Sequence, residues 1–218
     1  MGWSGGGGWN AKQGWSRPAP SGGGGGAAFT WNPADAGSNA VITNSNRDFG
    51  PASAGSWMSC RSNISKSAGK WYCEIAVPTA ASASKPNAGI GLAKSDFSTS
   101  SYLGSSDTSS GLLFAFPGSF FNSASMVNVT ATPSGDTVSP GDIYMMAFDF
   151  DSGKAWLGKN GSWFSGMDPV AGTGPWVTWT PGGNWFVAAT QNSNSTCTFR
   201  LPSTTTYSSP TGYSVLNA

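Results

Sequence analysis

The sequence predicts an all-β protein: an antiparallel β-sandwich of two sheets, preceded by an extended glycine-rich N-terminal arm. Strand-like runs of apolar residues recur at short intervals between clusters of turn residues, a spacing typical of sandwiches. No segment shows sustained helical periodicity. Aromatic residues make up 13% of the 218 residues, so a core between two sheets can be filled.

Residues 1–28 differ in kind from the rest of the chain. They contain runs of four and five glycines and too little apolar area to offset the backbone entropy of folding alone. Trp3, Trp9 and Trp15 nevertheless recur every six residues. Because an indole buries on the order of 150 to 250 Å² in a contact, these three are expected to anchor the arm in grooves of a partner protein. The alternative is a disordered glycine-rich tail.

Residues 29–218 are expected to form one folded domain. Each expected strand is a run rich in β-branched, aromatic or other apolar residues, bounded by Gly, Pro, Asn, Asp or Ser. In chain order, the expected strands are residues 41–43, 56–62, 70–77, 88–93, 111–116, 126–131, 142–150, 154–159, 176–179, 185–190 and 195–201.

The stretch 139–164 predicts its own connections. Residues 143–150 alternate bulky side chains on both faces, and residues 151–153 are a turn that leads into a second strand at 154–159. Asn160 and Gly161 suit the two positive-φ positions of a type I′ hairpin, after which a further strand is expected.

Three cysteines, Cys60, Cys73 and Cys197, are too few and too scattered for a zinc site or a disulfide framework. We expect them to be buried as small hydrophobic residues. In an alternative arrangement, Cys60 and Cys73 face each other on a hairpin and form one disulfide.

Composition excludes several classes of function. Charged residues make up only 10% of the chain and the net charge is +1, so neither nucleic acid nor an anionic membrane is an expected partner. No apolar run approaches the roughly 18 residues that span a bilayer, and the start of the chain lacks the basic and apolar regions of a signal peptide. We therefore expect neither membrane insertion nor conventional secretion.

The chain contains no histidine, which removes the commonest general base and the commonest metal ligand. The densest pair of acids is Asp149 with Asp151; such a pair can do acid–base work, but it equally well braces a turn, and we favour the turn. We expect no catalytic residue, no cofactor and no metal, and hence no enzyme.

Several short sequence motifs, in this order along the chain, resemble those of the SPRY domain, a lectin-like jelly-roll sandwich used mainly for protein recognition. The motifs are Gly-Lys-Trp-Tyr-Cys-Glu-Ile at 69–75, Gly-Ile-Gly-Leu-Ala at 89–93, Gly-Asp at 141–142, Asp-Phe-Asp-Ser-Gly-Lys at 149–154, Lys-Asn-Gly at 159–161, Trp-Phe-Val-Ala-Ala at 185–189 and Cys-Thr-Phe at 197–199. The resemblance covers roughly residues 29–218. It implies that Glu74 and Asp142 are framework acids that bind strand or loop backbone.

Two further motifs resemble the borders of SPRY domains in bacteriophage and phage-like structural proteins. One is Phe-Thr-Trp-Asn-Pro at 29–33, before the domain, and the other is Pro-Thr-Gly-Tyr-Ser-Val-Leu-Asn at 210–217. The resemblance also implies that a ligand docks on loops at one end of the sandwich. The candidate loop residues are Tyr102, Phe120, Phe121, Trp176 and Trp179. For Trp176 and Trp179 the alternative is that both close the sandwich as core residues.

The leading functional hypothesis is a phage virion protein, present in many copies, with its sandwich displayed on the capsid or tail. As a head decoration or fibre it would insert its arm into capsid subunits, whereas as a tail protein it would contact a host surface glycan or protein. The alternative is an intracellular adaptor that binds a peptide through the SPRY loops. Because an adaptor usually joins its SPRY domain to another functional region, the short glycine-rich segment before Phe29 favours the virion.

Overall fold

The computed structural model of the chain describes residues 1, 28–50, 57–79, 88–104, 110–116, 126–127, 138–192, 195 and 197–216. These residues form strands, turns and loops, and they include no helix that is long and apolar enough to cross a membrane. The arm tryptophans Trp3, Trp9 and Trp15 and the loop residues Phe120 and Phe121 lie outside the described residues.

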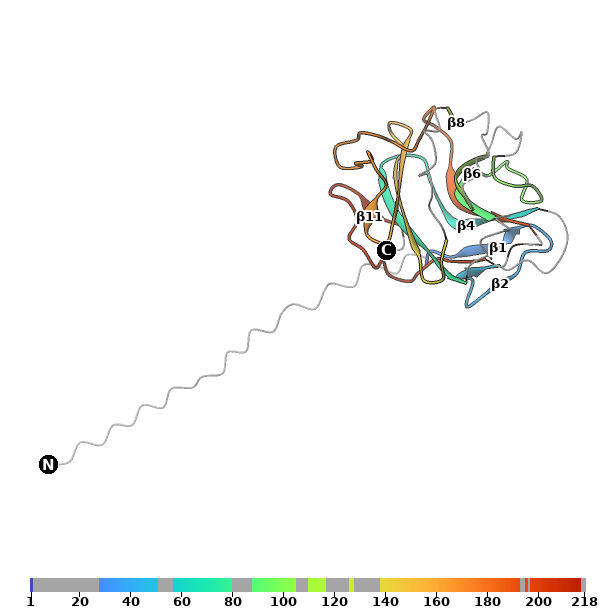
Figure 1. The fold of residues 1–218 in the computed structure, drawn as a ribbon, viewed down its shortest axis with the longest axis horizontal. Coiled ribbons are helices and arrows are strands. Elements are labelled where there is room, and N and C mark those ends of the chain that lie inside the picture. The colour runs from blue at the N-terminus through green and yellow to red at the C-terminus, as the bar shows by residue number, and fades with distance from the viewer. Residues whose placement is uncertain are drawn as a thin grey trace.

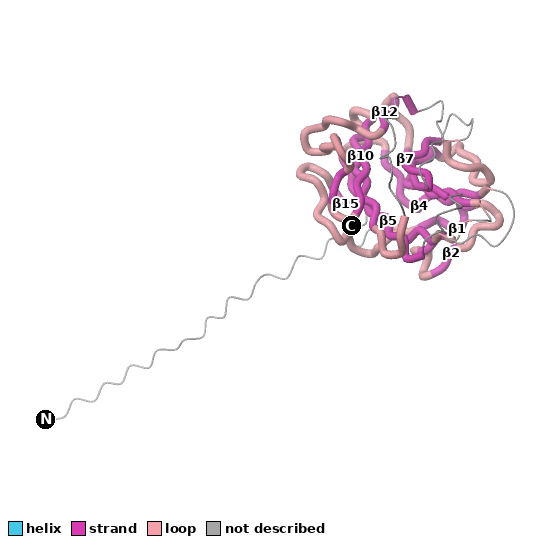
Figure 2. Tube along the Cα trace, viewed as in Figure 1, coloured by secondary structure: helices cyan, strands magenta, loops and turns pink. Residues whose placement is uncertain are grey.

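Two β-sheets pack against each other (Figures 1 and 2). Within the described residues, sheet A has the strand order β1 (Trp31–Ala36), β4 (Met58–Lys66), β13 (Trp185–Gln191), β6 (Ala88–Lys94) and β7 (Ser110–Phe116). Sheet B has the order β2 (Ile42–Thr43), β3 (Asp48–Phe49), β14 (Thr198–Arg200), β5 (Lys70–Thr79), β9 (Ile143–Asp149), β10 (Lys154–Lys159), β12 (Val177–Trp179) and β8 (Met126–Val127). β11 (Ser162–Trp163) pairs with β10, and β15 (Ser214–Val215) pairs in parallel with β5. The predicted all-β sandwich of two antiparallel sheets is confirmed.

Most expected strands are present and differ only at their ends. The prediction for residues 154–159 matches β10 residue for residue, and β11 follows the Asn-Gly turn as expected. Residues 128–131 of an expected strand lie outside the described residues. The sequence did not predict β1, β3 or β15. β1 contains Pro33, and its first residues were predicted only as the border before the domain. It is instead the outer neighbour of β4, a position where a missing backbone N–H is tolerated.

The main core lies between the sheets and follows the two-residue period of the strands. On β5, Cys73, Ile75 and Val77 point into this core, whereas Tyr72 belongs to a second cluster on the outer face of sheet B. β9 and β10 are buried on both faces in the same way, which explains why their sequences are apolar almost without interruption.

Residues 202–216, called the C-terminal strap, cover the outer face of sheet B. Tyr213 packs edge-on against Trp156 of β10 with ring centroids 6.4 Å apart, and its hydroxyl donates to the carbonyl oxygen of Pro169 at 3.1 Å. The backbone N–H of Leu216 donates to Tyr72 O at 2.8 Å beside the parallel β15–β5 pairing. The strap therefore provides the second layer that lets the central strands of sheet B be apolar on both sides.

The cysteines are buried and form no disulfide. Cys60 lies on β4 in sheet A and Cys73 on β5 in sheet B, so the hairpin alternative, in which both share one sheet, was wrong. Both belong to the main core. Burial raises the pKa of the Cys60 thiol to about 12, which keeps it protonated and unreactive.

The turn after β10 is the predicted type I′ hairpin. Asn160 and Gly161 have φ values of 50° and 87°, and Lys159 pairs with Ser162 across the turn. The Asn160 side chain also accepts a hydrogen bond from the N–H of Ile143 at 2.8 Å and donates to Asp142 at 2.9 Å. One asparagine thus closes the hairpin and fixes the entry to β9.

Candidate functional site

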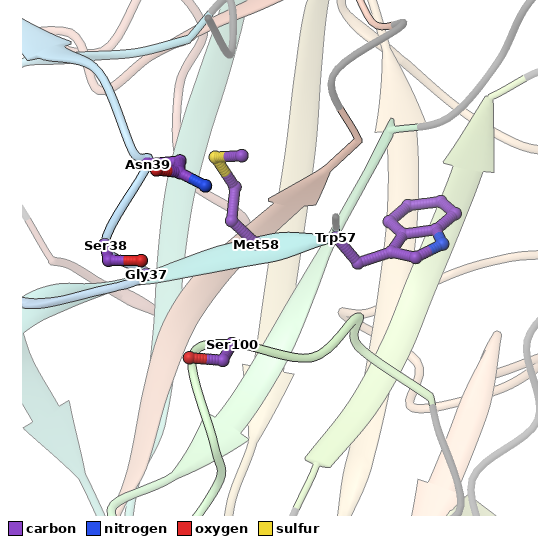
Figure 3. Close-up of a pocket in the computed structure, with 6 residues that line it drawn as sticks. All are labelled: Gly37, Ser38, Asn39, Trp57, Met58 and Ser100. Carbon is purple, nitrogen blue, oxygen red and sulfur yellow. The ribbon is translucent and has the colours of Figure 1, made fainter. Parts of the chain in front are cut away.

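A pocket of about 270 Å³ opens beside the start of β4 (Figure 3). Three chain segments meet around it: the loop after β1, the first residues of β4, and the loop after β6. We call residues 37–39 the first wall and residues 95–104 the second wall. The lining residues are Gly37, Ser38, Asn39, Trp57, Met58 and Ser100.

The lining is polar but uncharged. Ser38, Asn39 and Ser100 are exposed and offer two hydroxyls and an amide, whereas Met58 is buried and supplies an apolar floor. In Figure 3 the amide of Asn39 points toward the Met58 side chain, and the indole of Trp57 extends away from both, beyond the start of the strand. Such a lining suits a neutral group that forms hydrogen bonds and packs one apolar face.

The Trp57 indole is held by the second wall. Its ring lies 5.1 Å from the ring of Tyr102, centroid to centroid, at an interplanar angle of 50°. Both side chains are half-buried. Among the predicted ligand-loop residues that the structure describes, Tyr102 is thus the one that lies against a residue of the pocket lining.

Ser59 joins the two walls through one residue of β4. Its backbone N–H donates to Thr99 O at 2.8 Å, its carbonyl oxygen accepts from Gly37 N at 2.9 Å, and its hydroxyl donates to Ser101 O at 2.7 Å. Ser59 is fully buried, whereas Thr99 and Ser101 are half-buried, so the Ser59 side of these bonds is removed from water. The two walls consequently have a fixed spacing.

The walls also touch directly at Gly37. A Cβ atom on this residue would lie 2.8 Å from Thr99 O and 2.9 Å from Met58 Cβ, closer than real Cβ contacts allow. Glycine is needed here for close approach of two backbones, not for an unusual φ.

Trp176 and Trp179 are core residues. Their side chains are 0% and 4% exposed, and Trp179 contacts the rings of Phe150 and Trp185 at 5.8 and 5.9 Å. The hypothesis that these indoles stack on a ligand does not fit this burial, and the alternative that they close the sandwich does. Trp176 precedes β12 and Trp179 ends it, and both are tied to the β10 side of sheet B, since Trp176 N donates to Ala155 O at 2.7 Å and Trp179 N donates to Gly153 O at 2.9 Å.

The first wall and Trp57 were missed as site residues. Ser and Asn are abundant throughout this chain, so Ser38 and Asn39 carry no distinguishing signal in the sequence. Trp57 was placed inside an expected strand, but β4 begins one residue later. Only the pairing of β1 with β4 brings these residues together.

The acidic residues named from the sequence are used by the fold. Asp149 accepts hydrogen bonds from the N–H groups of Asp151 and Ser152 at 3.1 Å each, and Asp151 accepts from Gly69 N at 2.9 Å. The interpretation of this pair as a turn brace is confirmed. Within the described part of the chain, no group of three or more Cys, Asp or Glu side chains could hold a metal ion.

Glu74 is 1% exposed and binds the strap. It accepts hydrogen bonds from the N–H groups of Thr206 and Tyr207 at 2.7 and 2.8 Å and from the hydroxyl of Tyr72 at 2.7 Å. This is the framework role that the family resemblance implies.

Asp142 has the same kind of role at the entry to β9. It accepts from Ser139 N at 2.7 Å and pairs with the ammonium of Lys159 at 2.8 Å. Burial would raise the pKa of Asp142, but hydrogen bonds from Lys159, Asn160 and Ser139 outweigh it and lower the pKa below its ordinary value of 3.8.

Neither a family model nor a curated protein sequence matches this chain. Solved structures do match it. The SPRY domain of human HERC1 is 13% identical, with a TM-score of 0.59, and the match covers 78% of this chain and 96% of that one. A human SPRY domain is 14% identical, with a TM-score of 0.51, and the match covers 75% of this chain and 94% of that one. At such low identity the likeness concerns the fold, and this chain has the fold of a SPRY domain.

Proposed function

We propose that this chain is a non-enzymatic recognition protein of a phage virion. The SPRY-like sandwich is displayed on the capsid or tail, its pocket end binds a partner, and the arm with Trp3, Trp9 and Trp15 attaches it to other virion proteins. In this proposal the partner is a protein or glycan of the host surface, and the sandwich occurs in many copies per particle.

The pocket is the observation that carries the recognition half. It has an uncharged lining, a buried floor and walls held together by hydrogen bonds to the buried Ser59. A preorganised cavity of this kind loses little entropy when it binds a ligand. SPRY domains are generally protein-interaction modules, which favours recognition over catalysis for a chain with this fold.

Non-catalytic action is supported by what the acids do. Glu74, Asp142 and Asp149 each bind backbone N–H groups, so each is committed to holding a strand or a turn. None of the three lines the pocket. Asp142, with its lowered pKa, is ionised at neutral pH and holds no proton to donate.

The proposed place in a virion is supported by the sequence motifs at 29–33 and 210–217, by the low content of charged residues, 10%, and by the tryptophan-bearing arm. Its test is the composition of purified particles. Mass spectrometry should find the chain in them, and gold-labelled antibody should mark the head or the tail. Absence from particles would contradict this half and favour the intracellular adaptor.

The recognition half is tested by binding of the fluorescently labelled protein to cells that the particles infect. Asn39→Arg places a charge in the pocket and should abolish cell binding. Asn184→Arg is the matched control: Asn184 is also exposed, but it precedes Trp185 at the end of β13 far from Gln191, the residue that pairs with Met58. Equal binding by both variants would show that the pocket end does not mediate recognition.

A further inference from the structure

We infer that one ion pair outside the pocket, Arg61 with Asp35, positions both of its walls, so that binding at the pocket depends on two residues that do not line it. The inference rests on the proposed function insofar as it concerns binding. The positioning itself can be measured with no ligand present.

Arg61 reaches the second wall through backbone carbonyls. It lies on β4 two residues beyond Ser59, and its Nη1 atom donates to Lys94 O at 2.6 Å and to Phe97 O at 2.8 Å. These carbonyls stand at the end of β6 and in the first turn of the second wall. Arg61 therefore fixes the direction in which that wall leaves sheet A.

The same guanidinium reaches the first wall through Asp35. Nε of Arg61 donates to one carboxylate oxygen at 2.6 Å, and Nη2 donates to the other, which completes a bidentate pair. Asp35 belongs to β1, two residues before Gly37. The position of Asp35 therefore sets the course of the backbone that becomes the first wall.

The geometry leaves Arg61 little freedom. Its side chain is 7% exposed and lies over the ring of Phe186 at 5.7 Å from the centroid, so the guanidinium is enclosed between a ring, a carboxylate and two carbonyls. A planar group with fixed donor directions can hold these partners at one mutual angle. A lysine keeps the charge, but its three N–H donors all radiate from one nitrogen on a flexible stem, so it does not hold both walls at one mutual angle.

A second ion pair provides a matched control. Arg200 and Asp48 form the same bidentate arrangement, Nε to Oδ1 at 2.6 Å and Nη2 to Oδ2 at 2.7 Å, between β14 and β3 of sheet B. Neither residue lines the pocket. Replacing Arg200, whose side chain is 40% exposed, removes the same bidentate carboxylate pair but none of the carbonyl bonds that Arg61 makes, and it leaves both walls alone.

The test is ¹⁹F NMR of the full chain labelled with 5-fluorotryptophan, with the Trp57 resonance identified by its loss in Trp57→Phe. In Arg61→Lys this resonance should shift or broaden, because the indole loses its fixed position against Tyr102. In Arg200→Lys it should stay unchanged. Urea denaturation of both variants shows whether their losses of stability are comparable.

Two results would overturn the inference: an unchanged Trp57 resonance in Arg61→Lys, or an equal change in Arg200→Lys. If Arg61→Lys does not fold, Asp35→Asn serves in its place with Asp48→Asn as its control, since the Asp35 side chain is 26% exposed and tolerates the change better. The same two results then decide.

Cell binding separates this inference from the proposed function. We expect Arg61→Lys to weaken binding by about tenfold, the effect of one lost hydrogen bond or a displaced wall. If the Trp57 resonance changes but Asn39→Arg still binds cells normally, the ion pair positions the pocket and the pocket is not the recognition site. If Asn39→Arg abolishes binding and the resonance does not change, the recognition site stands and the role of Arg61 fails.

Discussion

At the scale of single residues, Gly37 is the clearest case of a side chain that the fold cannot accept. Gly37→Ala would place a methyl group 2.8 Å from Thr99 O and 2.9 Å from Met58 Cβ, so the two walls must separate. We expect a loss of about 1 to 3 kcal/mol in the free energy of unfolding, as for other overpacked sites. Urea denaturation measures it, with Ser38→Ala as the exposed neighbouring control. A loss no larger than that of the control would mean that the walls part without cost.

Asp142 gives the protein a defined pH response. Its pKa in the folded state lies below the ordinary value of 3.8, so the carboxylate stabilises the fold above that value, and the contribution disappears as the pH falls through the folded-state pKa. The native protein should therefore be more stable than Asp142→Asn at pH 7, and the difference should shrink below pH 3.8. Urea denaturation of both proteins across this range checks the sign. A difference that grows with acid would contradict the assignment.

At the scale of elements, the strap is held by Tyr213 as well as by Glu74. Tyr213→Ala removes the contact with Trp156 and the hydrogen bond to Pro169 O, and we expect it to cost about 3 to 5 kcal/mol, as for other buried aromatic residues. Tyr213→Phe keeps the ring and should cost about 1 kcal/mol. Thermal and urea unfolding distinguish the two. Equal effects of both substitutions would assign the stability to the hydroxyl alone.

Strands that carry their own signal were predictable from the sequence, and strands defined by a partner were not. β10 has apolar residues bounded by a Ser-Gly turn and an Asn-Gly turn, so both of its ends can be predicted from the local sequence. β3 and β15 have two residues each and exist because β14 and β5 offer them hydrogen bonds. Two residues alone carry too little alternation to predict a strand, and β11, which is equally short, was predictable only from the Asn-Gly turn before it.

The same distinction applies to the site. Tyr102 could be named because a family resemblance gave its loop a role. Asn39 and Trp57 come from segments far apart in sequence and meet only when β1 pairs with β4. For Trp176 and Trp179 the sequence left two alternatives, ligand contact or core, because a tryptophan near glycines looks the same in sequence whether it faces solvent or the core; their burial favours the core.

At the scale of the whole molecule, the arm and the sandwich should be separable. Replacing Trp3, Trp9 and Trp15 by Ala should abolish incorporation into particles, since the indoles are the proposed anchors. The melting temperature of the sandwich should not change, because its described core draws on residues from Phe29 onward. Quantitative mass spectrometry of particles and a thermal melt of the purified protein measure the two effects. Normal incorporation of the triple variant would sink the anchor proposal.

The pocket and the two ends of the described domain lie at different places on the sandwich. The pocket lies at the start of β4, beside Met58, whereas Ala28 bonds to Asn63 further along the same strand and Leu216 bonds to Tyr72 near the start of β5. The backbone thus enters and leaves the fold away from the pocket. For protein engineering, this arrangement suits insertion of the domain into another protein. Spliced through residues 28 and 216 into a surface turn of another protein, it would present the pocket outward, and randomising Ser38, Asn39 and Ser100 would create a library of binding surfaces on an unchanged frame.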